Sequence, residues 1–248
     1  MGIWQKFFMI WQKNVSKKYS GAGEERKMFE GLPMEETNNY EKWCEQWREK
    51  FLKMDQEELK RRLPELKEEG NWLTISHFGR RLGVHKENGK IIAMEDHDPV
   101  TCYERLNVYT LFGYVSPLAH YKDDWVRFDR LKDTSPFSKA FQEGVTEPFS
   151  RMFSGHVKEL SRACEQLGGK KLPWSDAGYE LEAFACIPVR FLFWDGDDEF
   201  PAQGNVLFDA SATDFIHGES VVTIAAIGLD RIAKLAGVPL DRSIFPIF

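Results

Sequence analysis

Four acidic side chains that follow an apolar stretch are the first residues in this chain that could do chemistry. Residues 191–194 run directly into a loop that contains Asp195, Asp197, Asp198 and Glu199. Hard cations such as Mg²⁺, Ca²⁺ and Mn²⁺ bind carboxylate oxygens at ~2.0–2.6 Å, so this loop could hold a divalent metal. Its spacing differs from that of an EF-hand, however, and Asp and Gly are common turn residues. We therefore favour an exposed turn and keep the metal site as the alternative.

Arg190 and Asp209 are charged residues beside apolar, strand-like segments. A buried carboxylate is costly unless it is paired, and Arg190 is the natural partner if the two segments are neighbouring antiparallel strands. We predict a structural ion pair between them, in which loss of one partner costs ~3–5 kcal/mol. If they do not pair with each other, both become available to a ligand.

His217 lies between Asp214 and Glu219, just before the last long helical segment. It could titrate near neutral pH and join Asp209 and the acidic loop in a metal site, although helix capping by this cluster is the simpler interpretation. The candidates for binding a small ligand are Arg190, Trp194, Asp209 and His217. The chain contains no His-Glu-x-x-His, Gly-x-Ser-x-Gly, phosphate-loop or Gly-x-Gly-x-x-Gly motif, so we predict no particular reaction and no particular cofactor.

Aromatic residues are a second source of binding chemistry. The chain has eight tryptophans, and 14% of its residues are aromatic. Core packing accounts for most such side chains, but some could line a groove for a flat ligand. The candidates for such a groove are Trp4, Trp11, Trp125 and Trp174.

Composition narrows the class of protein. A formal net charge of −6 argues against a general grip on nucleic acid, which needs a basic face. No apolar run approaches the ~20 residues that span a bilayer. The four cysteines are widely spaced, without a Cys-x-x-Cys pair, and are expected to be reduced thiols. We expect a cytoplasmic protein whose partner is a small molecule or another protein.

Residues 1–19 carry four lysines and no acid, with apolar residues spaced to share one helical face. Such a helix could lie on an anionic membrane surface, dock in the groove of a partner or pack on its own domain, and we favour the last. Residues 20–26 resemble a linker. The predicted organisation is a helical extension with its linker at 1–38 and a single domain at 39–248.

The remaining sequence predicts an α+β fold in which a mainly antiparallel sheet packs against helices. Apolar periodicity predicts helices at 39–54, 99–111, 147–167 and 218–236, and another that begins after Asp55. Strands are predicted at 72–78, 84–87, 90–94, 123–128, 179–184, 189–194 and 205–210. Asn88-Gly89 suits a type I′ hairpin turn, and the apolar segment 189–194 should lie inside the sheet.

Several segments carry a resemblance to a known family. They are ISHFGRRLGV, LNVYTLFGYV, DDWVRF and, most specifically, WDGDDEFPAQGNVLFDAS. Through them, the chain from about residue 40 to its end resembles the uncharacterised prokaryotic family called domain of unknown function 3786. The resemblance implies a protein of anaerobic bacteria and archaea that is found in the cytosol. It implies no activity and therefore no catalytic residues.

The sequence leaves three functional hypotheses open. The first, which we favour, is a non-catalytic binding or accessory protein with a pocket between the sheet and the last helix and the acidic loop at its mouth. The second is a divalent-metal-dependent enzyme that uses the acidic loop. The third is a role at a membrane surface or in partner docking through residues 1–19.

Overall fold

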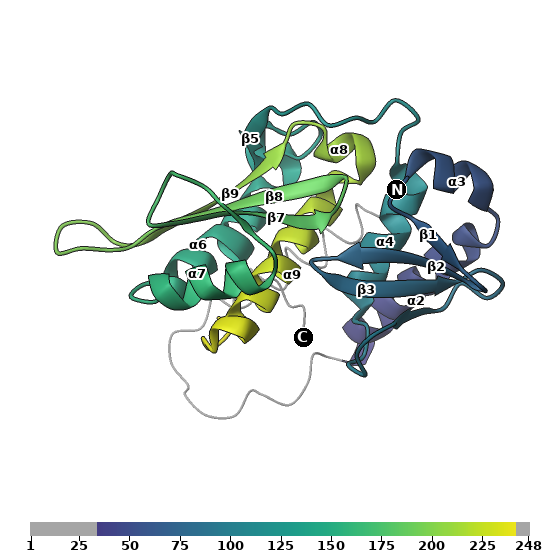
Figure 1. Cartoon of the computed structure of the whole chain (residues 1–248), viewed down its shortest axis with the longest axis horizontal. Helices are drawn as coiled ribbons and strands as arrows, with labels where there is room; N and C mark the ends of the chain where they lie inside the picture. Colours follow the sequence, from purple (N-terminus) through teal and green to yellow (C-terminus); the bar gives the residue numbers. More distant parts are fainter. Residues whose placement is uncertain (1–33, 242–248) are drawn as a thin grey trace. The chain divides into compact units, whose positions relative to one another are not determined.

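The computed structural model describes residues 34–241, which are drawn in colour in Figure 1. The chain forms two compact units, Met1–Lys42 and Trp43–Phe248. The α-helices are α2 (Met34–Phe51), α3 (Gln56–Arg62), α4 (Cys102–Tyr114), α5 (Ser138–Phe141), α6 (Glu147–Phe153), α7 (Val157–Gln166), α8 (Ala212–Phe215) and α9 (Gly218–Ala236). Two 3₁₀ turns, η1 (Phe128–Arg130) and η2 (Ser135–Phe137), and a π-helical turn, η3 (Gln142–Thr146), complete the helical elements among these residues. The predicted helix at residues 1–19 lies outside the described residues.

Two antiparallel sheets belong to the second unit, which confirms the predicted α+β class. The first sheet contains β1 (Lys67–Glu69), β2 (Trp72–His77), β3 (Arg80–His85) and β4 (Ile91–Ala93), in that order. The second contains β5 (Trp125–Arg127), β6 (Lys170–Lys171), β7 (Ala177–Phe184), β8 (Ile187–Trp194) and β9 (Gln203–Asp209). Its order is β5-β9-β8-β7-β6, so β8 is the central strand, as its apolar sequence predicts. No helix among residues 34–241 combines the length and the apolar character needed to cross a bilayer.

The tightest hairpin of the first sheet differs from the predicted one. His77 pairs with Arg80, and both residues of the connecting turn, Phe78 and Gly79, have positive φ, at 47° and 74°. A type I′ turn requires this combination. At the predicted position, Asn88-Gly89, only Gly89 has positive φ, and β3 and β4 are joined by a longer connection. The prediction of a type I′ turn at Asn88-Gly89 was therefore wrong.

Local capping explains where the predicted helices differ from the observed ones. The predicted helix at 99–111 instead begins at Cys102, because Thr101 and Glu104 form a reciprocal capping box. The predicted helix at 147–167 is two helices, interrupted where Gly155 adopts φ 76°. The helix predicted at 39–54 begins at Met34 and ends at Phe51, before Asp55 caps α3.

The core lies between the second sheet and its helices, which Figure 1 shows with α6, α7 and α9 on one side of the sheet. Phe191 and Phe193 of β8 are almost fully buried and contact Phe149 of α6, with ring centroids 6.0 and 5.6 Å away. Helix α9 ends at Gly237, as predicted. A Cβ atom built on Gly228 would lie 2.7 Å from the Phe191 ring, so sheet and helix are in direct contact at this point. The predicted pocket between sheet and helix is filled here by core side chains.

A buried histidine connects the two sheets. The His77 Nδ1 atom of β2 lies 2.8 Å from the Ala183 carbonyl of β7, and its ring stacks on Phe184 at 4.4 Å. Its Nε2 atom lies 3.3 Å from Asn107 of α4, which in turn accepts a hydrogen bond from Thr223 of α9. Neutral His77 satisfies both contacts if Nδ1 carries the proton, so this residue fixes the sheets to each other and to both helices.

Candidate functional site

The face of the second sheet that points away from the core carries several polar and aromatic side chains. Side chains alternate along a strand, so Arg190 lies on the opposite face from its buried neighbours in β8. The register aligns residues from all five strands in one row across the sheet. The row consists of Arg127, Leu207, Arg190, Glu180 and Lys170. Arg190 therefore lies near the centre of this face.

Arg190 is held by one acid and two tryptophans. Its Nε atom donates to Glu180 Oε2 at 2.8 Å, and its guanidinium carbon lies 3.6 Å from the Trp125 ring centroid and 5.5 Å from that of Trp174. Both ring distances are within the range of a cation–π interaction. The two terminal nitrogens of Arg190 make no hydrogen bond to any described residue. A fixed guanidinium thus keeps its terminal donors available.

A groove of about 940 Å³ opens beside Arg190. Helix α3 and the residues after it contribute Arg61, Arg62 and Glu65, and other lining residues include Tyr121, Asp123, Lys170, Glu180 and Pro188. Tyr121, in the wall of the groove, is 48% exposed, and Trp174, which lies near Arg190 but outside the lining of the groove, is 52% exposed. Glu180 is already bonded to Arg190, and Glu58 is bonded to Arg61 and Arg62. The groove therefore carries both signs of charge, and its cations include Lys170 as well as Arg190, whose guanidinium is the one held against a tryptophan ring among the residues described.

Asp209 does not pair with Arg190, so that prediction was wrong. Arg190 pairs in register with Leu207, two residues before Asp209, and takes its acid from β7 instead. The Asp209 carboxylate is buried and accepts hydrogen bonds from the backbone of Lys122 and Asp124, both at 3.1 Å, and from Ser211. Burial opposes ionisation, but these hydrogen bonds outweigh it and hold the pKa of Asp209 below its usual value.

The consequence is a positioning role for Asp209. Its hydrogen bonds to the backbone of Lys122 and Asp124 fix the segment that leads into β5. This segment contains Tyr121, and β5 begins at Trp125, which pairs with Asp209 in the strand register. Asp123 adds to this arrangement by accepting hydrogen bonds from the Tyr121 hydroxyl and the Trp125 indole nitrogen. Asp209 therefore supports the aromatic side of the Arg190 groove without lining it.

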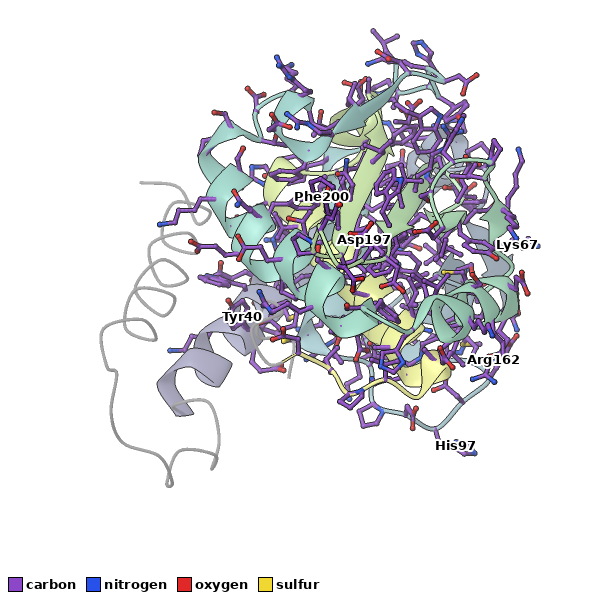
Figure 2. All side chains as sticks on the ribbon, turned by 90° about the vertical axis from the view of Figure 1, so that its left-hand side faces the viewer. Tyr40, Lys67, His97, Arg162, Asp197 and Phe200 are labelled. Atoms are coloured by element: carbon purple, nitrogen blue, oxygen red, sulfur yellow. The ribbon has the colours of Figure 1, made fainter. Side chains whose placement is uncertain are left out.

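The four acids of the loop lie in the connection between β8 and β9. Asp197, Asp198 and Glu199 are exposed, and Figure 2 labels Asp197 and Phe200 of this connection on the side facing the viewer. Asp197 accepts hydrogen bonds from the backbone of Glu199 and Phe200, and that of Phe200 contributes most to lowering its pKa. Asp195 accepts hydrogen bonds from the backbone of Gly155 and Gly196. Among the side chains that the structure describes, no three of His, Cys, Asp or Glu are grouped closely enough to hold a metal ion.

Trp194 shares the outer face of β8 with Arg190 and is 40% exposed, but it lines a different groove. That groove, of about 970 Å³, lies between the β8–β9 connection and the segment around η3. Its basic residues are paired, Arg127 with Asp129 at 3.0 Å and Lys139 with Glu143 at 3.6 Å. It is slightly larger than the groove at Arg190, but it offers no comparable fixed donors.

His217 is the N-cap residue of α9, so capping of this helix comes from the cluster in which it was predicted. Its Nδ1 atom accepts a hydrogen bond from the Glu219 backbone at 3.2 Å, and its ring lies 5.2 Å from that of Tyr114. Burial lowers its pKa, although Asp133 opposes this effect. Asp214 instead pairs with Lys122 at 2.7 Å. The structure thus brings Arg190, Trp125 and Trp174 together, and places His217 in a helix cap.

Sequence reasoning missed Glu180 and Tyr121. Glu180 is one of two acids in β7, and the charge of Arg190 on the adjacent strand was the signal that could have pointed to it. Tyr121 precedes the predicted strand at 123–128 and gave no separate signal.

The architecture defines an α+β domain with a polar, aromatic groove on the outer face of its second sheet. Residues 55–231 match the family model described as Domain of unknown function (DUF3786). The match covers well over half of the chain, so the chain belongs to this family. It includes Arg190, Trp125 and Trp174 and confirms the resemblance seen in the sequence. Neither the curated proteins nor the solved structures gave a match.

Proposed function

We propose that this protein is a non-catalytic, cytoplasmic binding or accessory protein that holds a small, planar, singly charged anion in the groove at Arg190. The observation that carries the proposal is the arrangement of Arg190, whose Nε is bonded to Glu180 and whose guanidinium lies against Trp125, while its terminal nitrogens are unbonded within the described residues.

The chemistry of the guanidinium sets the charge of the ligand. A carboxylate or phosphate accepts two parallel hydrogen bonds from an arginine, and charge-assisted hydrogen bonds are about twice as strong as neutral ones. Stacking on Trp125 restricts the guanidinium before any ligand arrives, so less conformational entropy is lost on binding. Acids such as Asp123 and Glu182 also line the groove, which disfavours ligands with several negative charges.

The aromatic residues set the shape of the ligand. Trp174 and Tyr121 are about half exposed, and an aromatic ring stacked on such a surface gains contact area without meeting a charge. A planar carboxylate therefore fits better than either a neutral planar molecule or an aliphatic acid of similar size. Benzoate, benzamide and cyclohexanecarboxylate are matched probes for these two properties.

Titration of tryptophan fluorescence with the three probes tests the proposal. Benzoate should bind more than tenfold tighter than benzamide, because a hydrogen bond to a charged group contributes ~1.5–3 kcal/mol and a factor of ten corresponds to ~1.4 kcal/mol. It should also bind more tightly than cyclohexanecarboxylate. Arg190→Lys keeps the charge but removes the planar fork, and should abolish most of the preference for benzoate over benzamide.

The exposed Arg162 of α7, labelled in Figure 2, provides the control. Arg162→Gln removes a positive charge outside the groove and should leave all three affinities unchanged. Equal affinities for benzoate and benzamide in the natural protein, or a preference that survives Arg190→Lys, would show that Arg190 does not recognise an anion.

A further inference from the structure

A second pocket, of about 530 Å³, lies where the β2–β3 turn, the segment before α4 and the C-terminal half of α9 meet. Its walls share no residue with the groove at Arg190. The charged residues that matter for the argument are Arg80, Asp96, Glu104, Asp230 and Arg231. Apolar surface comes from Phe78, Leu167, Ile227 and Leu235. Pockets at such junctions between structural layers are common ligand sites.

Two of these charged residues are fully used within the protein. Arg80 donates to both carboxylate oxygens of Asp96 and to Glu104, and its side chain is only 8% exposed. Glu104 also accepts hydrogen bonds from Thr101 and from Arg231 Nη2, the latter at 2.8 Å. Arg80 and Glu104 therefore form the floor that holds Arg231 in place.

Arg231 and Asp230 retain unused hydrogen-bonding groups. The contact with Glu104 is the one hydrogen bond of the Arg231 guanidinium within the described residues, which leaves most of its N–H groups available. Asp230 is 6% exposed; one carboxylate oxygen lies 2.8 Å from Lys234 Nζ, and the other, Oδ1, is buried without a hydrogen-bond partner among the residues described. Leaving such an acceptor unsatisfied is unfavourable, so it calls for a partner.

We propose that this pocket binds a small zwitterion, a free α-amino acid with an apolar side chain, through a carboxylate on Arg231 and an ammonium group on the Asp230 carboxylate. The two protein groups both line the pocket and have opposite charge, so a ligand with both charges satisfies each without repelling the other. Ile227 and Leu235, on the same helix, offer apolar surface to the side chain.

The charges that face Asp230 support this choice. Burial raises the pKa of Asp230, while Lys234 and Arg231 oppose the rise and Glu104 adds to it. A bound ammonium group would offset the cost of ionising Asp230 in the pocket. An anion without an ammonium group would gain only the contact with Arg231, and an amine without a carboxylate only that with Asp230.

Calorimetric titration of the full chain with L-leucine and its two half-molecules tests the proposal. These are 4-methylpentanoate, which lacks the amino group, and 3-methylbutylamine, which lacks the carboxylate. Leucine should bind at least tenfold tighter than either, which corresponds to ~1.4 kcal/mol. Glycine and L-phenylalanine extend the series to smaller and larger side chains.

Two variants assign the contacts. Asp230→Asn should lower the affinity for leucine to that for 4-methylpentanoate, and Arg231→Gln should lower it to that for 3-methylbutylamine. Arg162→Gln should bind as the natural protein does, and circular dichroism should show that each variant is folded. Failure of all three amino acids to bind at millimolar concentration, or binding of leucine no tighter than that of its halves, would overturn the proposal. Because the natural protein alone gives these results, the test does not depend on the variants folding.

Discussion

Acid should destabilise this protein through His77, and the size of the effect can be worked out from the structure. His77 is completely buried, and burial lowers its pKa from 6.5 to about 4, although the hydrogen bond with Ala183 opposes the shift. The folded state therefore holds neutral histidine, whereas the unfolded chain takes up a proton near its ordinary pKa. Below that point the unfolded state binds more protons, so stability falls as the pH falls.

The pH window and the magnitude follow from the same pKa values. The contribution of His77 is fully present above pH 6.5 and is lost as the pH falls towards about 4. A difference of about 2.5 pKa units at ~1.36 kcal/mol each gives a loss of about 3 kcal/mol. Glu219 has the opposite effect on the pH dependence of stability. Burial raises its pKa, so its contribution to stability increases as the pH falls. The whole-protein curve therefore contains both effects, and a variant is needed to separate them.

Urea unfolding of the natural protein and of His77→Gln across this pH range isolates the effect. Glutamine does not titrate, so the free energy of unfolding of His77→Gln should fall by about 3 kcal/mol less between neutral pH and pH 4 than that of the natural protein. His120→Gln, which changes an exposed histidine, is the matched control for the substitution itself. Parallel pH curves for His77→Gln and the natural protein would refute the claim that His77 is buried in its neutral form.

Three further predictions concern packing and buried charge. Gly228→Ala places a Cβ 2.7 Å from the Phe191 ring and should destabilise the fold by ~1–3 kcal/mol in thermal unfolding, whereas an unchanged melting temperature would show that α9 packs less closely. Asp209→Ala removes the acceptor of three backbone N–H groups, of which that of Ser211 is buried, so we expect a loss of ~1–3 kcal/mol in urea unfolding together with weaker benzoate binding; no change in either would show that Asp209 has no positioning role. Glu104→Gln breaks a buried ion network and should cost ~3–5 kcal/mol by the same assay, and a loss within experimental error would show that Arg80 is adequately held without it.

The sequence predicted those elements in which one local signal dominates. The apolar segment at 218–236, followed by Gly237, defines α9, and the two-sided apolar character of 189–194 identifies the central strand. It failed where a local signal was misleading at one position and absent at another. Asn88-Gly89 has the composition of a type I′ turn, but positive φ occurs at both turn residues of Phe78-Gly79 instead, and a phenylalanine at that position gives no warning in the sequence.

The sequence predicted the residue types of the candidate site but not how the strands pair them. Arg190, Trp125 and Trp174 were recognised by residue type, and the structure brings them together. The partner of Arg190 was misassigned because residue type does not specify strand register: Asp209 lies two residues beyond the position opposite Arg190, and Glu180 lies directly opposite on the other neighbouring strand. The pocket at Asp230 collects residues from segments far apart in the chain, so no local pattern could indicate it.

Nuclear magnetic resonance of side-chain N–H groups during a benzoate titration tests the central claim most directly, because it locates the ligand as well as detecting it. The indole N–H signals of Trp125 and Trp174 and the Nε–H signal of Arg190 should shift together with a single affinity. The indole signal of Trp72, which contacts His85 in the first sheet, should stay in place. Shifts confined to tryptophans other than Trp125 and Trp174, or an Arg190 signal that does not move at saturating benzoate, would contradict the account.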